Sequence, residues 1–328
     1  MTEHIFLTGG TGFIGRHLTD VLLKNGFTVT LLVHKKTYQG ADHPNLNIVH
    51  GDIRHPSPWK HILSNADIVI HAAGSVSEMN FYRYISINTE ATMILARECS
   101  LHDNIRQFIF ISSLSAAGPS EPGNPIREFY PADPVSEYGK SKLMAEGRLL
   151  NLATPFSKII IRPPAVYGPC DNAFLPVFKM AVNRIRLVYN HGISEFSLIH
   201  VMDLCNIIVQ VILSPRLKQD EIFFVNDGEP MHTLEELFDL MEKITQRKTI
   251  PVQVHRLLFG GVFYLAELSG TVMGKTHLLT VDKYRELKQK AWTCHSYKLM
   301  DLLDYKINYP LEIGLRDTYT WYRKHHWL

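Results

Sequence analysis

Short apolar runs alternate with amphipathic stretches along the first half of the chain. The apolar runs predict strands at residues 5–7, 28–33, up to about 49, 67–71, 108–111 and 158–161. The amphipathic stretches between them predict helices at residues 13–24, 82–99 and 137–150. Strands that alternate with helices in this way are typical of an α/β fold in which helices cover both faces of a doubly wound parallel sheet.

The chain changes character after residue 162. Longer helical stretches replace the short strand and helix units, and four prolines follow closely, namely Pro163, Pro164, Pro169 and Pro176. A predicted helix at residues 201–213 and a predicted strand at 222–225 return to the sheet. We therefore expect a sheet domain over residues 1–162 with returning segments near 196–226, and a smaller, mostly helical C-terminal lobe formed by residues 163–195 and 227–328.

The composition is that of an ordinary globular protein. Of the 328 residues, 45% are hydrophobic and 20% are charged. The 34 basic and 32 acidic residues leave a net charge of +2 without a block of like charge. This distribution argues against nucleic acid as a partner, because binding through phosphates needs clustered positive charge.

The cysteines and histidines follow no metal-binding or disulfide pattern. The four cysteines stand far apart without C-x-x-C spacing, and the 17 histidines include no H-E-x-x-H motif. With no export signal ahead of the first strand, these features predict a cytoplasmic protein without a metal ion. The apolar stretch 257–273 is interrupted by Glu267 and several glycines, which favours a helix over the C-terminal lobe rather than an interfacial membrane anchor.

A glycine-rich turn connects the first predicted strand to the first predicted helix. Residues 8–15 read T-G-G-T-G-F-I-G, so glycines stand where a tight turn brings the backbone close to a pyrophosphate and a helix N-terminus offers its amides. In this position the turn predicts a Rossmann-type dinucleotide site. The residues of the turn expected to contact the dinucleotide are Gly9, Thr11, Gly12, Phe13, Ile14 and Gly15.

The end of the second predicted strand bears on the choice of dinucleotide. Val33 is followed by His34, Lys35 and Lys36 rather than by the acidic residue that would hold the ribose diol of NAD. These basic side chains favour the 2′-phosphate of NADP. A short basic run is also commonly just solvated, and Arg16 is another candidate for the phosphate.

Asp52 and Ile53 follow the third predicted strand, at the same edge of the sheet. The Asp52 carboxylate can accept a hydrogen bond there from the adenine amino group, or it can cap the backbone of its own turn. Both residues are therefore candidates for the cofactor site, and the two roles of Asp52 stay open.

Tyr138 and Lys142 lie four residues apart on the predicted helix 137–150 and therefore share one face of it. A free phenol titrates near pH ~10, so acid–base chemistry at neutral pH calls for a neighbouring ammonium, such as Lys142, that lowers the pKa of the phenol. Ser112 and Ser113 follow another predicted strand and emerge at the carboxyl edge of the sheet, where one hydroxyl could polarise a substrate carbonyl.

Four further segments complete a recognisable pattern. They are His71-Ala72-Ala73-Gly74 after the fourth strand, Asn88 in the next helix, R-P-P-A-V-Y-G-P at residues 162–169, and I-H-V-M-D-L at residues 199–204. Together with the glycine turn and the Tyr-x-x-x-Lys pair, they make the chain resemble the extended short-chain dehydrogenase/reductases, also called the NAD-dependent epimerase/dehydratase family. The resemblance covers nearly the whole chain.

The resemblance implies a role for each of these residues. Tyr138 is expected to donate or accept the proton, Lys142 to lower its pKa and bind the nicotinamide ribose, and Ser113 rather than Ser112 to bind the reacting oxygen. Asn88 looks like the family's supporting asparagine. The dinucleotide is also expected to contact Ala72, Ala73, Gly74 and Pro163, besides Tyr138 and Lys142. The resemblance further implies a homodimer.

Two positions bear on the substrate. Nucleotide-sugar members of the family carry an asparagine and an arginine where this chain has Ala165 and Phe196, replacements that suit an uncharged, largely apolar molecule better than a diphosphate. The chain then resembles dihydroflavonol-reductase-like and 3β-hydroxysteroid-dehydrogenase-like members, which implies hydride transfer between NADP or NAD and a carbonyl or secondary alcohol. The alternatives are a nucleotide-sugar epimerase or dehydratase with tightly bound NAD and, from another class, a dinucleotide-sensing protein without turnover.

Overall fold

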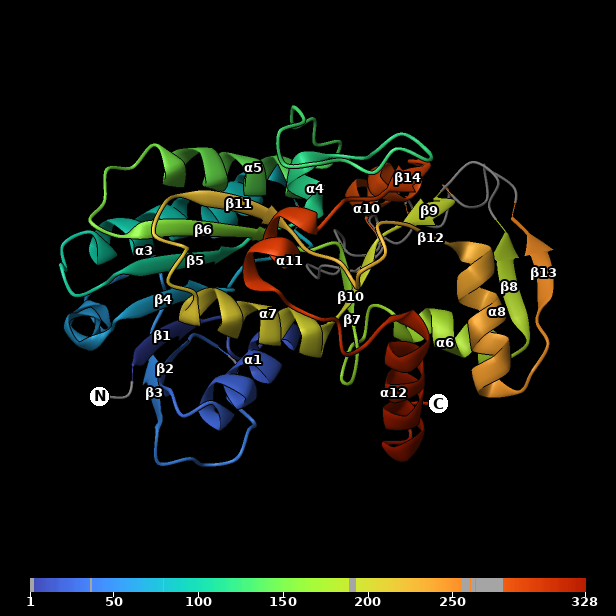
Figure 1. Cartoon of the computed structure of the whole chain (residues 1–328), viewed down its shortest axis with the longest axis horizontal. Helices are drawn as coiled ribbons and strands as arrows, with labels where there is room; N and C mark the ends of the chain where they lie inside the picture. Colours follow the sequence, from blue (N-terminus) through green and yellow to red (C-terminus); the bar gives the residue numbers. More distant parts are fainter. Residues whose placement is uncertain are drawn as a thin grey trace.

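Seven parallel strands form the central sheet of the computed structural model, which describes residues 3–35, 37–78, 80–188, 193–254, 260, 263 and 280–328 (Figure 1). The strands are β1 (His4–Thr8), β2 (Thr28–Val33), β3 (Leu46–His50), β4 (Ile68–His71), β5 (Gln107–Ile111), β6 (Ser157–Arg162) and β11 (Glu221–Phe224). Their order is β11-β6-β5-β4-β1-β2-β3, so the chain reverses its direction of travel between β1 and β4. The predicted α/β fold class and doubly wound parallel sheet are confirmed.

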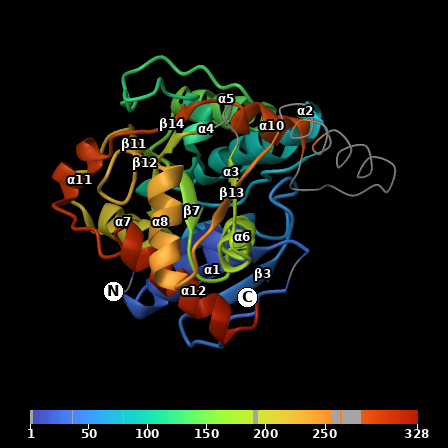
Figure 2. The ribbon, with the colours of Figure 1, turned by 90° about the vertical axis from the view of Figure 1, so that its right-hand side faces the viewer.

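Helices cover both faces of this sheet (Figures 1 and 2). The four main ones are α1 (Phe13–Lys24), α3 (Ala91–Cys99), α5 (Glu137–Leu150) and α7 (Val201–Leu213). Successive side chains of β1 point to opposite faces of the sheet. Ile5 and Leu7 join the apolar cluster of α1 and α7 on one face, and Phe6 joins that of α3 and α5 on the other. All three side chains are fully buried, so the sheet has a packed core on each face.

Local sequence signals set the limits of the main helices. Helix α5, which carries Tyr138 and Lys142, begins after Ser136. The Ser136 hydroxyl accepts a hydrogen bond from the amide of Gly139 at 3.0 Å. The limits predicted from the sequence, 13–24, 137–150 and 201–213, are those of α1, α5 and α7. The predicted strand 222–225 corresponds to β11, which pairs with β6 at the edge of the sheet.

The predicted helix 82–99 is not one regular α-helix. The structure has α2 (Phe81–Tyr84), then a π-helical turn η2 (Ile85–Glu90), and then α3. The predicted helix is confirmed in its extent, and the π-helical turn within it is a detail that apolar periodicity does not reveal. Asn88 lies within the π-helical turn, and such turns often occur at functional positions.

A second apolar core lies in the C-terminal part of the chain, where α6, α8 and α12 gather at the end away from the N-terminus (Figures 1 and 2). Its helices and short strands are β7 (Ala165–Tyr167), α6 (Leu175–Val182), β8 (Ile185–Val188), β9 (Glu195–Phe196), β10 (Leu198–His200), β12 (His232–Thr233), α8 (Leu234–Thr245), β13 (Ile250–Gln253), β14 (Ala291–Trp292) and α12 (Leu311–Lys324). The remaining elements are η1 (Lys60–Asn65), α4 (Leu114–Ala117), α10 (Val281–Leu287) and α11 (Tyr297–Leu303).

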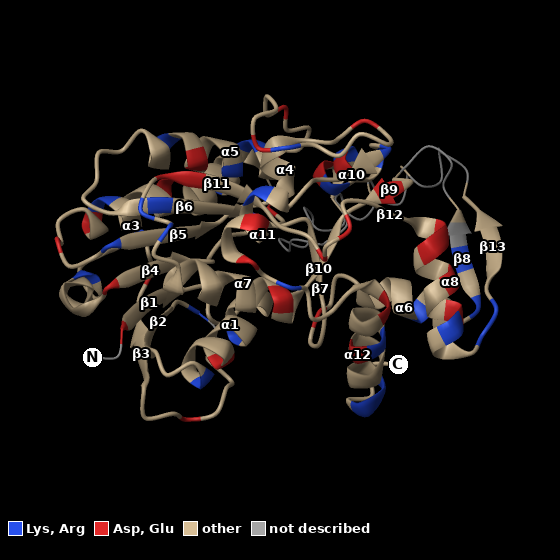
Figure 3. Cartoon of the chain, viewed as in Figure 1, with Lys and Arg blue, Asp and Glu red and all other residues tan. Residues whose placement is uncertain are grey.

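The apolar stretch 257–273 lies outside the described residues except for Gly260 and Phe263. Among the residues that the structure describes, no helix is both long enough and apolar enough to cross a membrane. Lysines and arginines are interspersed with acidic side chains over the visible elements (Figure 3). The cytoplasmic location and the homodimer stay predictions.

Candidate active site

The glycine turn after β1 needs its glycines for two different reasons. Gly9 has φ +81°, and a Cβ there would lie 2.5 Å from the carbonyl carbon of Ala72. A Cβ at Gly15 would lie 2.1 Å from the carbonyl oxygen of Gly9, so the turn and α1 touch directly. Gly12 is exposed at the start of α1, and its amide donates to the Gly9 carbonyl at 2.9 Å. This narrow, uncharged turn fits the pyrophosphate of a dinucleotide.

Three polar side chains meet where β2 and β3 end. Arg54 binds both carboxylate oxygens of Asp52, with Nη2 2.6 Å from Oδ2, and His34 Nδ1 lies 3.3 Å from the same oxygen. The hydrogen bond with Arg54 holds the pKa of Asp52 at about 2, well below its usual value. The sequence reasoning missed Arg54, although it stands only two residues after Asp52. Lys36 lies outside the described residues, and Arg16 is exposed on α1.

Asp52 shows one of the two roles that the sequence left open. Its Oδ1 accepts the amide of Arg54 at 2.9 Å, so the side chain caps its own turn. Its backbone oxygen accepts the indole N–H of Trp59 at 2.9 Å, which fixes the loop against the core. A contact with adenine stays a prediction, as does the contact of Ile53.

A buried chain of hydrogen bonds runs from the glycine turn to the π-helical turn. Thr92 Oγ1 donates to the carbonyl of Asn88 at 2.6 Å, so it must accept its bond from His71 Nε2 at 2.9 Å. The other ring nitrogen of His71 then accepts from Thr8 Oγ1 at 2.6 Å. Burial lowers the pKa of His71 to about 3, and the charge of Lys142 acts in the same direction. A neutral histidine therefore connects β4 to its neighbours.

Asn88 joins the loop after β4 to α5. Its Oδ1 accepts the amide of Ser75 at 2.8 Å, and its Nδ2 donates to the Ser75 carbonyl at 3.0 Å and to Ser141 Oγ at 2.9 Å. A Cβ at Gly74 would lie 3.1 Å from Asn88 Oδ1 and 3.2 Å from Lys142 Nζ. A side chain at position 74 would therefore crowd these two polar groups.

Lys142 is buried beneath this loop, with 4% of its surface exposed. Its ammonium donates to the carbonyl of Ile111 at 2.9 Å and lies 4.7 Å from the centre of the Phe110 ring. Burial lowers its pKa to about 8, against the opposing effect of the Glu146 carboxylate one turn further along α5. The charged ammonium is therefore held in a largely apolar setting at the end of β5.

Tyr138 and Ser113 are joined by a side-chain hydrogen bond. Ser113 caps α4, its Oγ accepting the amide of Ser115 at 3.1 Å. Burial raises the pKa of Tyr138 above its usual value, while a hydrogen bond with Ser113 acts in the opposite direction. The lowering expected from Lys142 does not appear, because burial has the largest effect on this pKa.

The two serines after β5 point to different partners. Ser112 Oγ donates to the buried carboxylate of Glu146, whereas Ser113 interacts with Tyr138. The structure therefore brings Ser113, Tyr138, Lys142 and Asn88 together at the carboxyl edge of the sheet. Glu146 and its partner Arg162 were not identified from the sequence, although Glu146 follows Lys142 by four residues on the same face of α5.

The positions thought to face the substrate differ in their surroundings. Ala165 is exposed on β7. Phe196 is only 8% exposed and packs in the second apolar core with residues such as Tyr167 and Phe178, so it does not add apolar surface as the sequence suggested. The carbonyl of Pro163 accepts the amide of Leu114 at 2.8 Å, which ties this segment to α4.

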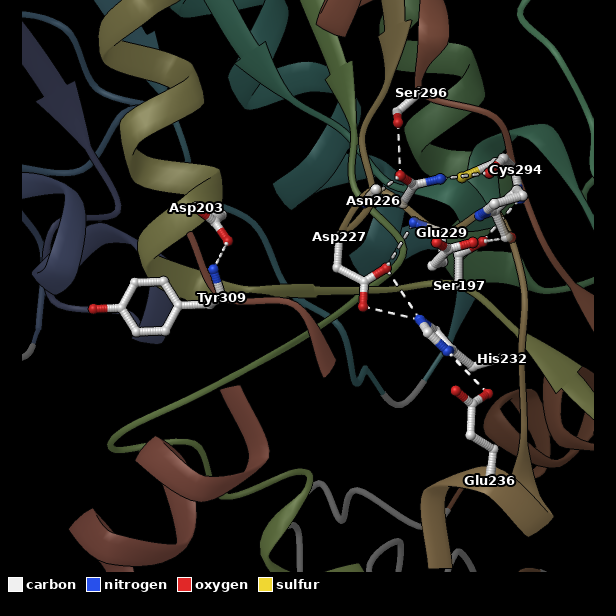
Figure 4. A network of polar contacts seen from close by, with 12 residues as sticks. Ser197, Asp203, Asn226, Asp227, Glu229, His232, Glu236, Cys294, Ser296 and Tyr309 are labelled. Carbon is white, nitrogen blue, oxygen red and sulfur yellow. Dashed lines mark hydrogen bonds and ion pairs between the residues drawn. The ribbon is translucent and has the colours of Figure 1, made fainter. Parts of the chain in front are cut away.

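Buried polar groups hold the I-H-V-M-D-L segment at residues 199–204 in place (Figure 4). The Asp203 carboxylate accepts the amide of Tyr309 at 2.8 Å, and the ring of Tyr309 stacks on His200 with centres 4.3 Å apart. Nearby, His232 lies between Asp227, at 2.9 Å, and Glu236, at 3.1 Å (Figure 4). The contacts of Asp203 and His200 join α7 and the end of β10 to the segment after α11, and those of His232 join β12 to α8 and to the loop after β11.

Two further carboxylates approach α5 from a distant part of the chain. Asp282 and Glu286, both on α10, bond to the first residues of α5. No sequence pattern pointed to them, because the partners are separated by 144 residues or more.

Comparison with known proteins agrees with this geometry. A UDP-glucose 4-epimerase of Vibrio cholerae is 30% identical over 290 residues, which are 83% of this chain and 87% of that protein. A ceramide reductase of Caulobacter vibrioides is 28% identical over 337 residues, covering 99% of this chain and 96% of that protein. A solved UDP-glucuronic acid 4-epimerase from Bacillus cereus, in complex with UDP-glucuronic acid and NAD, shares the fold with a TM-score of 0.77, 22% identity, and coverage of 98% of this chain and 99% of that one.

The pattern of one family extends over most of the chain. The NAD dependent epimerase/dehydratase family matches residues 5–225, from β1 to the residue after β11. This range includes the glycine turn, Asn88, Ser113, Tyr138 and Lys142. The protein therefore belongs to the NAD-dependent epimerase/dehydratase family.

Proposed function

We propose that the protein is an NADP-preferring oxidoreductase that transfers hydride to or from a carbonyl or secondary alcohol on a largely apolar small molecule. In this proposal, residues 1–162 with returning segments near 196–226 bind the dinucleotide, and the lobe of residues 163–195 and 227–328 binds the substrate. The observation that carries the proposal is the burial of the Lys142 ammonium beside Gly74 and the end of β5, one helical turn after Tyr138 on α5. Burial of a charged group costs free energy, so a buried ammonium at this position indicates a functional site.

Each of the four polar residues of the site has its own role in the proposed reaction. The nicotinamide, when bound, supplies or accepts the hydride. Tyr138 Oη donates its proton to the oxygen that becomes an alcohol, and the raised pKa keeps the phenol protonated at neutral pH. Ser113 Oγ orients the same oxygen, and the Lys142 ammonium stabilises the phenolate that remains. Asn88 holds Ser75 and Ser141 and so keeps the loop after β4 in place.

The basic groups at the ends of β2 and β3 support NADP over NAD. His34 and Arg54 keep 41% and 42% of their side chains exposed, so both are accessible to a 2′-phosphate. Lys35 follows directly in the chain. The carboxylate of Asp52, which lies beside them, already pairs with Arg54, and this pairing limits its repulsion of a phosphate.

An apolar substrate is supported by the exposed methyl group of Ala165, where nucleotide-sugar members of the family carry an asparagine. The likeness to a ceramide reductase, which extends over 99% of this chain, supports the same conclusion, because the name of that relative describes a lipid substrate. We therefore place lipid-like ketones first among the candidate substrates.

Nucleotide titration is the first test. The protein is stripped of nucleotide and titrated with NADPH and NADH while nucleotide fluorescence is recorded. Oxidation of NADPH is then followed with long-chain ketones, steroid ketones and UDP-glucose as substrates. The proposal requires tighter, reversible binding of NADPH and turnover of apolar ketones, and Tyr138→Phe should lower turnover by about two to four orders of magnitude while leaving NADPH binding unchanged.

A nucleotide-sugar epimerase with tightly bound NAD is the second candidate. It is favoured by the 30% identity to a UDP-glucose 4-epimerase over 83% of this chain. NAD that co-purifies and resists removal, together with conversion of UDP-glucose without net oxidation of nucleotide, would put this candidate first. Binding of nucleotide without turnover of any substrate would instead indicate a sensing protein.

A further inference from the structure

The first turn of α5 is anchored by α10, a helix more than 140 residues further along the chain. The amides of Glu137 and Tyr138 donate to the two carboxylate oxygens of Asp282 at 2.7 and 3.1 Å. Ser136, the residue that caps α5, donates its hydroxyl to Glu286 at 2.8 Å while accepting the amide of Gly139. Figure 2 shows α10 beside α5 and α2 at the same end of the sheet.

These contacts satisfy the free donors of the helix end. The first amides of an α-helix have no partner within the helix, and here Asp282 takes two of them and Ser136 Oγ takes the third. One of the two amides bound by Asp282 is that of Tyr138 itself. The backbone that carries the reacting phenol is thus held by a carboxylate of the C-terminal lobe.

Charge pairing holds the two carboxylates in position. Arg285 Nη1 lies 3.2 Å from Glu137 Oε1 and 3.5 Å from Asp282 Oδ1, so it bridges α5 and α10. Lys283 Nζ lies 2.7 Å from Glu286 Oε2 within α10. The Asp282 side chain is 13% exposed and that of Glu286 is 8% exposed, so both contacts are largely shielded from water.

The geometry around the phenol makes its position sensitive to this anchor. Tyr138 is the second residue of α5, and its ring lies 6.2 Å from that of Tyr84, which is buried. A shift of the first helical turn would move the phenol relative to Ser113 and Lys142, which are held by other elements. Displacements of about 1 Å at a reacting group can cost on the order of a hundredfold in rate.

We propose that Asp282 and Glu286 are positioning residues, which hold the first turn of α5 so that Tyr138 faces Ser113 and the reacting oxygen. This inference rests on the proposed function of Tyr138. It connects the lobe that would bind substrate with the phenol that would transfer the proton. Asp282 carries most of the effect, because its carboxylate binds the amide of Tyr138 directly, whereas Glu286 acts through Ser136.

The position of the phenol can be measured without a substrate. The full-length protein is labelled with tyrosine carrying ¹³C at Cζ, and Tyr138→Phe identifies the Tyr138 resonance. Asp282→Ala should shift or broaden that resonance. Asp282→Asn, which keeps one acceptor oxygen, should produce a smaller change. The control is Glu312→Ala, which removes a carboxylate from the first turn of α12 that pairs with Arg316, away from α5.

Turnover provides the second readout, with NADPH and the apolar ketone that the wild-type protein reduces fastest. Asp282→Ala should lower kcat by about ten- to a hundredfold, with the Kd for NADPH unchanged and Asp282→Asn intermediate. The inference is overturned if the Tyr138 resonance does not move in Asp282→Ala, or if kcat matches that of Glu312→Ala. If Asp282→Ala does not fold, the same comparison with Asp282→Asn decides.

The two proposals fail in different ways. If no ketone is reduced, or Tyr138→Phe retains full activity, the proposed function is wrong, and the Tyr138 resonance still decides whether α10 positions the phenol. If Tyr138→Phe abolishes turnover while Asp282→Ala leaves both resonance and kcat unchanged, only the positioning role is wrong.

Discussion

Arg162 and Glu146 form a buried ion pair, in which Arg162 Nη2 lies 2.5 Å from Glu146 Oε2 and Nε lies 3.0 Å from Oε1. Their side chains are 5% and 2% exposed. The carboxylate also accepts the hydroxyl of Ser112 and lies one helical turn from Lys142, whose pKa it raises against the effect of burial. A single carboxylate therefore joins β6, the end of β5 and the lysine of the site.

Breaking this pair should destabilise the protein strongly. Glu146→Gln is expected to lower the free energy of unfolding by about 3–5 kcal/mol, because the Arg162 charge is left buried without a counterion. Urea unfolding followed by circular dichroism measures the change.

The exposed pair of Arg148 with Glu90 is the matched control, since Arg148 lies on the same helix. Both side chains are 46% exposed, so Glu90→Gln should cost no more than about 1 kcal/mol. Equal losses for the two glutamine variants would contradict the distinction between buried and exposed pairs.

Glycines of the first turn should separate cofactor binding from folding. Among the residues that the structure describes, a Cβ at Gly12 would contact the Gly9 carbonyl oxygen alone, at 3.2 Å, whereas a Cβ at Gly15 would lie 2.1 Å from that oxygen. We expect Gly12→Ala to keep its melting temperature while weakening NADPH binding by about tenfold or more, and Gly15→Ala to lower the melting temperature.

Gly147 on α5 provides the control for these substitutions, because no atom of the described part of the chain lies within 4 Å of a Cβ there. Gly147→Ala should leave NADPH binding unchanged and stabilise the protein by about 0.5–1 kcal/mol. If Gly12→Ala binds NADPH as tightly as the wild type, the glycine turn is not part of the cofactor site.

The activity should fall on the alkaline side as Lys142 loses its charge. Its pKa is lowered to about 8 by burial, so the ammonium becomes neutral above that pH and no longer stabilises the phenolate of Tyr138. The value of kcat/KM for NADPH, which reports on the free enzyme, should therefore decrease above pH ~8. A profile that stays flat to pH ~10 would show that this charge does not matter to turnover.

Arg54 and Arg16 give competing predictions for the 2′-phosphate. If Arg54 binds it, Arg54→Ala should weaken NADPH binding by about tenfold or more and leave NADH binding nearly unchanged, because the substitution also frees the Asp52 carboxylate to repel the phosphate. Arg16→Ala should affect both nucleotides little. If Arg16→Ala weakens NADPH binding and Arg54→Ala does not, the 2′-phosphate is bound at the start of α1.

His232 should make the C-terminal lobe more stable in its protonated form. Burial alone would lower its pKa, but Asp227 and Glu236 raise it above the ordinary 6.5. The folded state therefore binds the proton more tightly, so the stabilisation is complete below pH 6.5 and is lost as the pH rises through the folded-state pKa. Urea midpoints of the wild type and His232→Gln should differ most near pH ~6 and converge toward alkaline pH.

Local signals made much of the fold predictable. The limits of α1, β2, α5 and α7 follow from apolar periodicity and from caps such as Ser136, all of which act within a few residues. The grouping of Ser113, Tyr138 and Lys142 was predictable for a related reason. Strand ends in a parallel sheet share one edge, and residues four apart share one helix face.

What the sequence did not reveal depends on contacts between distant residues. The raised pKa of Tyr138 reflects its burial, and the place of Phe196 in the second apolar core depends on residues far from it in the sequence, such as Leu237 and Leu315. The wider turn at Asn88 keeps the apolar pattern of an α-helix. The anchoring of α5 by Asp282 joins segments between which no sequence pattern exists.

The edge strand β11 and the helix α7 also set the point in synthesis at which the protein can fold. Before residues 201–224 have left the ribosome, β6 has an unpaired edge and the part of α1 that packs against α7 has no cover. A nascent chain of the first 200 residues therefore exposes a strand edge and an apolar surface. Chaperones bind such surfaces, which otherwise promote aggregation. Completion of the sheet must wait until about two thirds of the protein has been made.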